Sequence, residues 1–394
     1  MSVTTRRVPV HSWLLAVTAG LLLAVPGPAH GAPTGGGPTG AGPTGAGPIE
    51  ITAPGSDTPA HLDGDPATTE RLDERDVTAA AVAASQRRFA AAGEGGRHAA
   101  HVVVGRDDHF ADSLAGTALT GAGPLLYTAR TALTDATGGE IDRLLGPSGG
   151  RVYLLGGTAA IDQGVAGALA VDGRDVVRLA GATRIETALA VADAVRGRTA
   201  RDEVFLARAY AAAGSPSSGW ADSVAVGGLA AATGIPVLLT PTAALHPAVA
   251  AWLAADGPAD TVLLGGEAAL ARDVELAVPN PTRVSGAERT ATAAAIAADL
   301  WGVPASGPRS FVIADGAKSD GWGFGLAAGG LASDAGAPVL LVTGQVTEAT
   351  GRLAGTCGAP EVDLLVVGDA SVVGESLRER LDRWDAEACE ADGA

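Results

Sequence analysis

The sequence predicts an α/β protein built from three tandem copies of one unit, each carrying a parallel sheet. Three observations support this fold class. An arginine-centred motif recurs at near-constant spacing, three further landmarks recur in the same order within each period, and short apolar runs alternate with Ala-rich helical stretches.

The recurring motif is clearest in its second and third copies. Arg178–Ala188 aligns without a gap on Arg283–Ala293, and six positions are identical. Arg71–Ala79 is a degenerate first copy, two residues shorter between its arginines. The motif threonines Thr78, Thr187 and Thr292 are separated by 109 and 105 residues, so each period has the length of a small domain.

Three landmarks follow the motif in each period: an aromatic-centred turn, a Pro-led apolar strand, and a strand ending in Gly. The turns are His109–Ser113, Gly219–Ser223 and Gly321–Gly325, the Pro-led strands are Pro124–Thr128, Pro236–Thr240 and Pro338–Thr343, and the Gly-ending strands are Val152–Gly157, Val262–Gly266 and Leu364–Asp369. Four features recurring in a fixed order indicate repetition of a whole fold.

The apolar runs are continuous and do not alternate with polar residues. Val102–Val104, Val204–Leu206 and Phe311–Ile313 are typical of strands covered on both faces, as in a parallel sheet. Between the strands lie helical patterns, of which the stretch beginning at the Thr183-x-x-Glu186 capping box is the clearest. In such sheets ligands bind beyond the carboxyl ends of the strands, where the Gly and aromatic turns fall.

The N-terminal residues predict that the protein is exported. Arg6 and Arg7 precede the uncharged apolar run Trp13–Val25, and Ala29–Gly31 offers a cleavage point, as in a signal peptide. The Gly-Pro-Thr repeats that follow cannot bury a core. The predicted divisions are a signal peptide (1–31), a flexible spacer (32–67), three modules (68–171, 172–278 and 279–384) and a C-terminal tail (385–394).

Charge and cysteine content narrow the function. The net charge of −17 argues against nucleic acid as a partner, and no later stretch predicts membrane insertion. In an exported protein Cys357 and Cys389, the only cysteines, are expected to form a disulfide.

The Arg-x-x-Gly-x-x-Arg-x-x-Thr-Ala motif, the aromatic-x-Asp turn and the Pro-Leu-Leu or Pro-Val-Leu strand together resemble the bacterial cell-wall-binding repeat type 2 family. The resemblance covers about residues 68–384. It implies three Rossmann-like modules in a pseudo-threefold arrangement, which attach a secreted protein to the wall or cell surface through an anionic polymer. The sequence departs from the pattern in its shortened first motif and in Phe324, which stands where the other turns have Asp112 and Asp222.

The motif arginines are the first candidates for polymer binding, because a guanidinium makes bidentate contacts to phosphate or carboxylate. They are Arg71, Arg178 and Arg283, expected at strand ends, and Arg75, Arg184 and Arg289, expected in first helical turns. The alternative is that each arginine pairs with an acid at a module interface.

Aromatic and acidic residues of the turns are the second candidates. Phe110, Trp220 and Trp322 could stack on sugar rings, although an aromatic residue beside a Gly-rich turn is more often part of the core. Asp112 and Asp222 are predicted either to bind the polymer or to cap the following helix.

Nothing in the sequence indicates an enzyme, a cofactor or a metal site. Nucleotide-binding glycine fingerprints and a nucleophile elbow are absent. The one metal-like cluster, His98, His101 and His109 with nearby aspartates, occurs in a single copy. The sequence therefore predicts a non-catalytic wall anchor, with a secreted hydrolase of wall or peptide substrates and an extracellular scaffold for partner proteins as alternatives.

Overall fold

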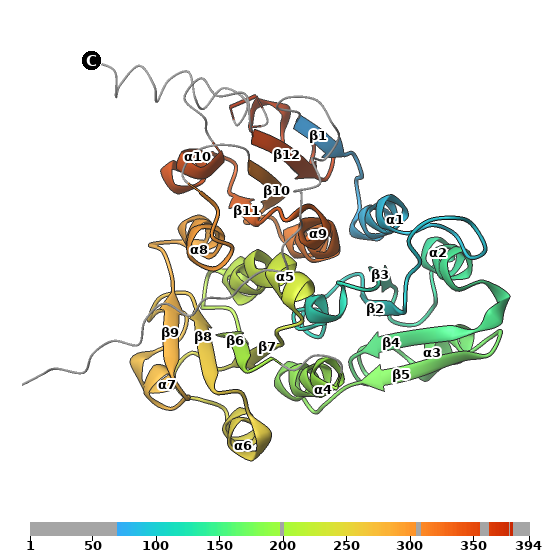
Figure 1. Ribbon diagram of the computed structural model, residues 1–394, viewed down its shortest axis with the longest axis horizontal. Helices are drawn as coiled ribbons and strands as arrows, with labels where there is room; N and C mark the ends of the chain where they lie inside the picture. The colour runs from blue at the N-terminus through green and yellow to red at the C-terminus, as the bar shows by residue number, and fades with distance from the viewer. Residues whose placement is uncertain (1–68, 198–200, 305–308, 355–361, 378, 381–394) are drawn as a thin grey trace, which may run out of the picture. The chain divides into compact units, whose positions relative to one another are not determined.

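A computed structural model of the chain describes residues 69–197, 201–304, 309–354, 362–377 and 379–380. The predicted signal peptide, the spacer, the C-terminal tail, Cys357 and Cys389 lie outside these residues. Within them the fold is α/β with three four-stranded parallel sheets, which confirms the predicted fold class (Figure 1).

The first sheet has the strand order β3-β2-β4-β5. Its strands are β2 (Val102–Arg106), β3 (Leu125–Thr128), β4 (Gly150–Leu155) and β5 (Arg174–Leu179). The helices that connect them are η1 (Gly116–Leu119), α2 (Asp135–Leu145), η2 (Gly146–Ser148) and α3 (Gln163–Leu169).

The second sheet repeats this order as β7-β6-β8-β9. Its strands are β6 (Glu203–Arg208), β7 (Val237–Thr240), β8 (Asp260–Leu264) and β9 (Pro281–Val284). The helices are α4 (Arg184–Arg196), which precedes the sheet, and η3 (Pro216–Gly219), α5 (Ala221–Thr233), α6 (Pro247–Asp256) and α7 (Arg272–Leu276). The predicted capping box of Thr183 and Glu186 begins α4.

The third sheet has the order β11-β10-β12-β1, so that the first strand of the chain completes the last sheet. Its strands are β10 (Arg309–Asp315), β11 (Val339–Val342), β12 (Val362–Val367) and β1 (Thr69–Leu72). The helices of this part are α8 (Arg289–Ala295) with a π-helical continuation η4 (Ile296–Leu300), α9 (Gly321–Ala335) and α10 (Glu348–Ala354), while α1 (Val77–Arg88) follows β1.

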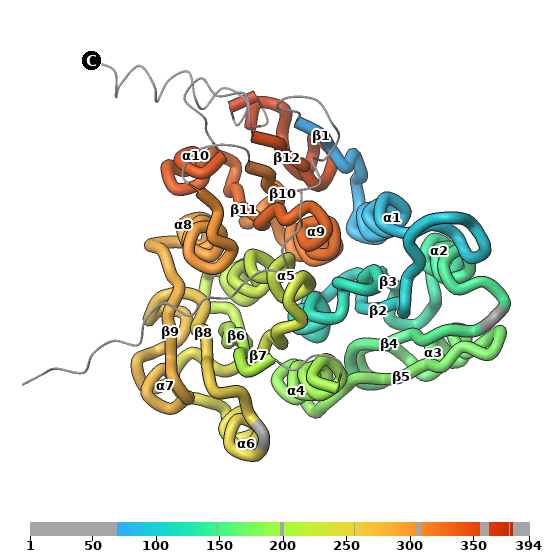
Figure 2. The backbone as a smooth tube through the Cα atoms, in the orientation of Figure 1, coloured from blue at the N-terminus to red at the C-terminus, as the bar shows by residue number. Residues whose placement is uncertain are grey.

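This topology corrects the prediction that each period contains all of its own strands. β5 and β9 were assigned to the second and third modules but pair with β4 and β8 of the preceding sheets. β1 was assigned to the first module and pairs in parallel with β12, so blue and red segments lie side by side in Figure 2. The arginine motif therefore begins on the last strand of one sheet and ends on a helix that leads to the next.

Two buried helices, α5 and α9, pack against each other and connect the second and third copies (Figure 1). Glycines allow the close approach: a Cβ on Gly228 would come within 2.8 Å of the Ala332 Cβ. The first copy has only the short helix η1 between its first two strands, because fewer residues separate β2 from β3 than separate β6 from β7. The Tyr127 hydroxyl of the first sheet donates to the Gly323 carbonyl of α9 at 3.0 Å.

A buried ion pair ties α1 to α9. The Arg88 Nε donates to Asp334 Oδ2 at 2.8 Å, and its Nη2 donates to the Thr120 carbonyl at 2.9 Å. The Arg88 side chain is 2% exposed, and burial lowers the pKa of its guanidinium despite the neighbouring carboxylate. The contact between the first and third copies is thus polar as well as apolar.

Candidate functional site

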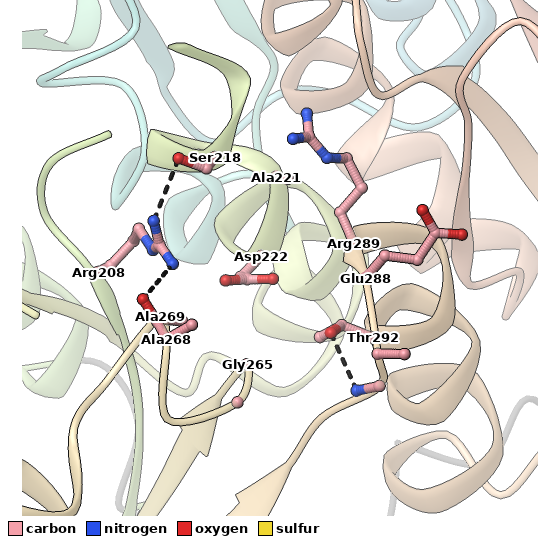
Figure 3. A pocket seen from close by; sticks show the side chains of 13 residues that line it. Arg208, Ser218, Ala221, Asp222, Gly265, Ala268, Ala269, Glu288, Arg289 and Thr292 are labelled. Atoms are coloured by element: carbon pink, nitrogen blue, oxygen red, sulfur yellow. Dashed lines mark hydrogen bonds between the residues drawn. The ribbon is translucent and has the colours of Figure 1, made fainter. Parts of the chain in front are cut away.

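A pocket of about 150 Å³ lies at the carboxyl ends of the strands of the second sheet (Figure 3). Residues from β6, α5, the β8–α7 connection and the start of α8 line it, so the second and third motif copies both contribute. The lining includes Arg208, Asp222, Glu288 and Arg289, surrounded by small residues. This position beyond the strand ends is the one at which parallel α/β sheets bind ligands.

Asp222 lies in the first turn of α5 and faces the pocket between Arg208 and Arg289 (Figure 3). It is only 9% exposed, and no hydrogen bond or ion pair joins its carboxylate to any residue that the structure describes. Burial raises the pKa of Asp222 to about 6, although Arg208 and Arg289 attract the charged form. The predicted helix cap is therefore wrong for Asp222, whose carboxylate is left for the pocket.

Arg208, the last residue of β6, is held by neighbouring groups. Its Nη1 donates to the Ser218 hydroxyl at 3.1 Å and its Nη2 to the Ala268 carbonyl at 2.7 Å. Its Nε is buried and has no partner among the described residues.

Arg289 begins α8 and reaches across to the loop that follows β6. Its Nη1 donates to the Gly316 carbonyl at 2.6 Å and to the Ser217 hydroxyl, and its Nη2 donates to the Ser215 hydroxyl at 3.1 Å. Hydrogen bonds within the protein thus hold both guanidinium groups in place, and part of their donors remains for other partners.

Glycine at position 265 makes room for the acidic side chain. Gly265 ends the strand β8 with φ of +93°, and a Cβ there would come within 2.8 Å of the Asp222 carboxylate. A glycine is therefore required at position 265 both by its backbone conformation and by the neighbouring acid.

The first copy carries the same group of residues. Arg106 ends β2, Asp112 follows in the next turn, and Arg184 begins α4, in the positions of Arg208, Asp222 and Arg289. Asp112 attracts both arginines electrostatically, and its carboxylate lies against Gly156 as that of Asp222 lies against Gly265. The Arg–Asp–Arg group is therefore repeated at two sheets.

The first-copy group differs in its surroundings. Arg106 forms a bidentate ion pair with Asp108, and Arg184 donates to the Ala209 carbonyl at 2.9 Å. The Arg184 guanidinium carbon lies 5.2 Å from the centre of the Phe110 ring and 5.1 Å from that of Tyr210. Tyr210 is 43% exposed, which leaves an aromatic surface beside this group.

The third copy lacks the group. Asp315 ends β10 where the other copies have an arginine, and it accepts hydrogen bonds from the backbone of Ala317 and Lys318. Phe324 occupies the position of Asp222 and is fully buried. Arg75 lies just before α1, not in its first turn, with an 86% exposed side chain that pairs with Asp369. The third copy is therefore not equivalent to the other two at this position.

The other motif arginines serve the sheets. Arg71, Arg178 and Arg283 each donate from Nη1 to the carbonyl of the Gly that follows the neighbouring strand, at 2.5, 2.8 and 2.7 Å. Arg71 also pairs with Glu375, and Arg283 with Glu275. These contacts favour the structural alternative for the three strand arginines.

The aromatic candidates separate in the same way. Trp220 and Trp322 are 2% and 3% exposed, so the hypothesis that they stack on sugar rings is wrong and both are core residues. Phe110 is half-buried against Arg184, His109 and Trp322. Arg208 and Tyr210 were not among the residues predicted from the sequence. For Arg208 a signal was available, because β2 and β6 end in arginines at matching positions.

The histidines of the metal-like cluster have other roles. His101 is buried with Nε2 at 2.8 Å from the Leu119 carbonyl, and His109 stacks on Phe110. Among the described residues no group of three His, Cys, Asp or Glu side chains could hold a metal ion. None of the helices within these residues combines the length and the hydrophobicity of a membrane span.

The chain belongs to the cell wall binding domain 2 (CWB2) family, which matches it three times, at residues 71–166, 178–275 and 283–378. The predicted family and its three tandem repeats are confirmed. The chain is thus a cell-wall-binding protein, a class that implies a location at the wall or cell surface.

Three individual proteins are similar to parts of this chain. The chain is 30% identical over 201 residues to N-acetylmuramoyl-L-alanine amidase LytC of Bacillus subtilis, which covers 50% of this chain and 38% of the amidase. Two solved structures share the fold, Cwp8 and Cwp6 from Clostridium difficile. Their TM-scores are 0.68 and 0.65 at 21% and 19% identity, covering 81% of this chain and 52% and 49% of theirs.

Proposed function

We propose that this chain is an exported, non-catalytic anchor that attaches non-covalently to an anionic secondary polymer of the cell wall. The observation that carries the proposal is the Arg–Asp–Arg group repeated at the carboxyl ends of two sheets, in a chain whose family binds the wall. Residues 1–31 act as the signal peptide and 32–67 as a spacer between the wall-binding modules and the new N-terminus.

Recognition has to be local because the chain as a whole is acidic. With a net charge of −17, long-range attraction does not draw an anionic polymer to the protein. Arg106 and Arg184 in the first copy, and Arg208 and Arg289 in the second, supply positive charge at the strand ends where a ligand binds. Arg75 adds an exposed guanidinium near the third sheet, where the Arg–Asp–Arg group is missing.

Two groups on one chain suit a repeating polymer. A second group that engages the same polymer molecule binds at a high effective concentration, so two weak contacts give strong retention. This reasoning also favours binding over catalysis, because an enzyme needs only one assembled site. The similarity to the amidase LytC covers 38% of that protein and supports a location of this chain at the cell wall.

The proposal is tested by sedimentation with purified, protein-free sacculi. We expect the mature chain to pellet with intact sacculi, to remain soluble after the polymer is stripped with hydrofluoric acid, and to release no soluble wall fragments. Retention on stripped sacculi would contradict the polymer as ligand, and released fragments would favour the hydrolase. Binding only to sacculi that retain their proteins would favour the scaffold.

A further inference from the structure

The second-copy pocket contains a hydrogen-bonding group that the protein itself does not satisfy. Asp222 is only 9% exposed, and its carboxylate faces the pocket and accepts no hydrogen bond from any described residue. Buried polar groups in folded proteins almost always have a partner, and an exception calls for an explanation such as a ligand. Arg208, which also lines the pocket, has a second unsatisfied group in its buried Nε.

The donors around Asp222 do not form a phosphate site. Bidentate binding of phosphate uses two parallel N–H groups of one guanidinium. Arg208 already donates twice, to Ser218 and Ala268, and Arg289 donates three times, to two serines and a carbonyl, so only part of each guanidinium is left for a phosphate. A phosphate in the pocket would also meet the negative charge of Asp222 at short range, where low dielectric strengthens the repulsion.

An unpaired carboxylate beside guanidinium donors matches the hydroxyl groups of a sugar, since each hydroxyl both donates and accepts. We propose that this pocket takes one neutral sugar residue of the wall polymer, with its hydroxyls donating to Asp222. The inference rests on the proposed function and names the part of the polymer that is recognised. The anionic groups of the polymer then remain outside the pocket.

The size and lining of the pocket agree with one sugar ring. Its volume of about 150 Å³ equals the room of about five water molecules in the liquid. Ala221, Ala268, Ala269 and Gly266 present small apolar surfaces to the C–H groups of a ring. No larger apolar side chain lines the pocket, so hydrogen bonds to Asp222 would dominate selection.

The other copies show why the second is the strongest candidate. Asp112 of the first copy is only half-buried, and Arg106 beside it is engaged by Asp108. The third copy has Phe324 at the position of Asp222 and therefore has no acceptor there. The sugar subsite is thus specific to the second copy, and a single substitution tests it.

The test is calorimetric titration of the mature full-length chain with two probes. One probe is the neutral, phosphate-free oligosaccharide that hydrofluoric acid releases from the wall, and the other is inorganic phosphate. The variants are Asp222→Asn, which removes the charge of the acceptor, and Gly266→Leu, which fills the pocket from a position where an added Cβ meets nothing within 4 Å. Asp260→Asn is the control, since Asp260 begins β8 at the opposite end of the same sheet.

We expect the oligosaccharide to bind the parent and Asp260→Asn equally, and both pocket variants to bind it about ten- to hundredfold more weakly. Phosphate should not displace it. The inference would be overturned if both pocket variants bound the oligosaccharide as tightly as the parent, or if Asp222→Asn bound phosphate in the pocket more tightly. In either case, retention of the parent on sacculi would still support the proposed function. A parent that is not retained on sacculi overturns both. Unchanged thermal midpoints of the variants, or a higher one for Asp222→Asn, exclude a folding defect.

Discussion

Replacing Asp222 by Asn should stabilise the folded chain at neutral pH. Burial raises the pKa of Asp222 from 3.8 to about 6, so the folded protein holds this proton more tightly than the unfolded chain does. The stability that comes from this difference is present below pH 3.8 and is lost as the pH rises through 6. A shift of about two pKa units corresponds to about 3 kcal/mol at pH 7.5, and Asn carries no charge to desolvate.

The assay is urea unfolding of the parent and Asp222→Asn at pH 7.5 and pH 4. We expect Asn to raise the free energy of unfolding by about 3 kcal/mol at pH 7.5, and by less than about 1 kcal/mol at pH 4. Asp112→Asn is the matched control in the first copy, because Asp112 is only half-buried. A variant that is less stable than the parent at pH 7.5, or equally stabilised at both pH values, would refute the reasoning.

Three further predictions concern two contacts between copies and the predicted disulfide. Arg88→Ala should destabilise the fold by about 1–3 kcal/mol, because it leaves the Thr120 carbonyl without its buried donor while Arg97 still pairs with Asp334, and thermal unfolding against the exposed-pair control Arg352→Ala measures this. Leu72→Ala in β1 should lower the free energy of unfolding by about 2–5 kcal/mol and speed amide exchange in β12, although the two strands are almost 300 residues apart. Faster exchange confined to the region of α1 would contradict the β1–β12 pairing. Cys357 and Cys389 should be bonded in exported protein, so two titratable thiols under denaturing, non-reducing conditions would contradict the disulfide.

The repeating parts of the fold could be predicted from the sequence because they follow from local patterns. Continuous apolar runs gave the strands β2, β6 and β10, and the capping box marked the start of α4. The exchange of edge strands between copies was not predictable, because a motif period fixes spacing along the chain and not the partner of its first strand. β1 pairs with β12, which lies near the other end of the sequence, only because the copies pack together.

The candidate site was predicted in position but not in detail. The sequence placed ligand-binding residues at the turns after the strands, and Asp222 and Arg289 line the pocket there. It could not distinguish an arginine that faces a ligand from Arg178, which donates to the Gly156 carbonyl, because both occur in the same motif. Nor could it show that Trp220 points into the core, since an aromatic beside a glycine turn fits either position.

The central claim is that the repeated Arg–Asp–Arg groups hold the chain on the wall polymer. The most direct measurement is the sacculus affinity of the parent, of Arg106→Ala, of Arg208→Ala and of the double variant. Each folded variant should bind more weakly, and the double variant should lose far more than either single variant because multivalent attachment is gone. If the folded double variant binds sacculi as tightly as the parent, these groups do not form the binding site.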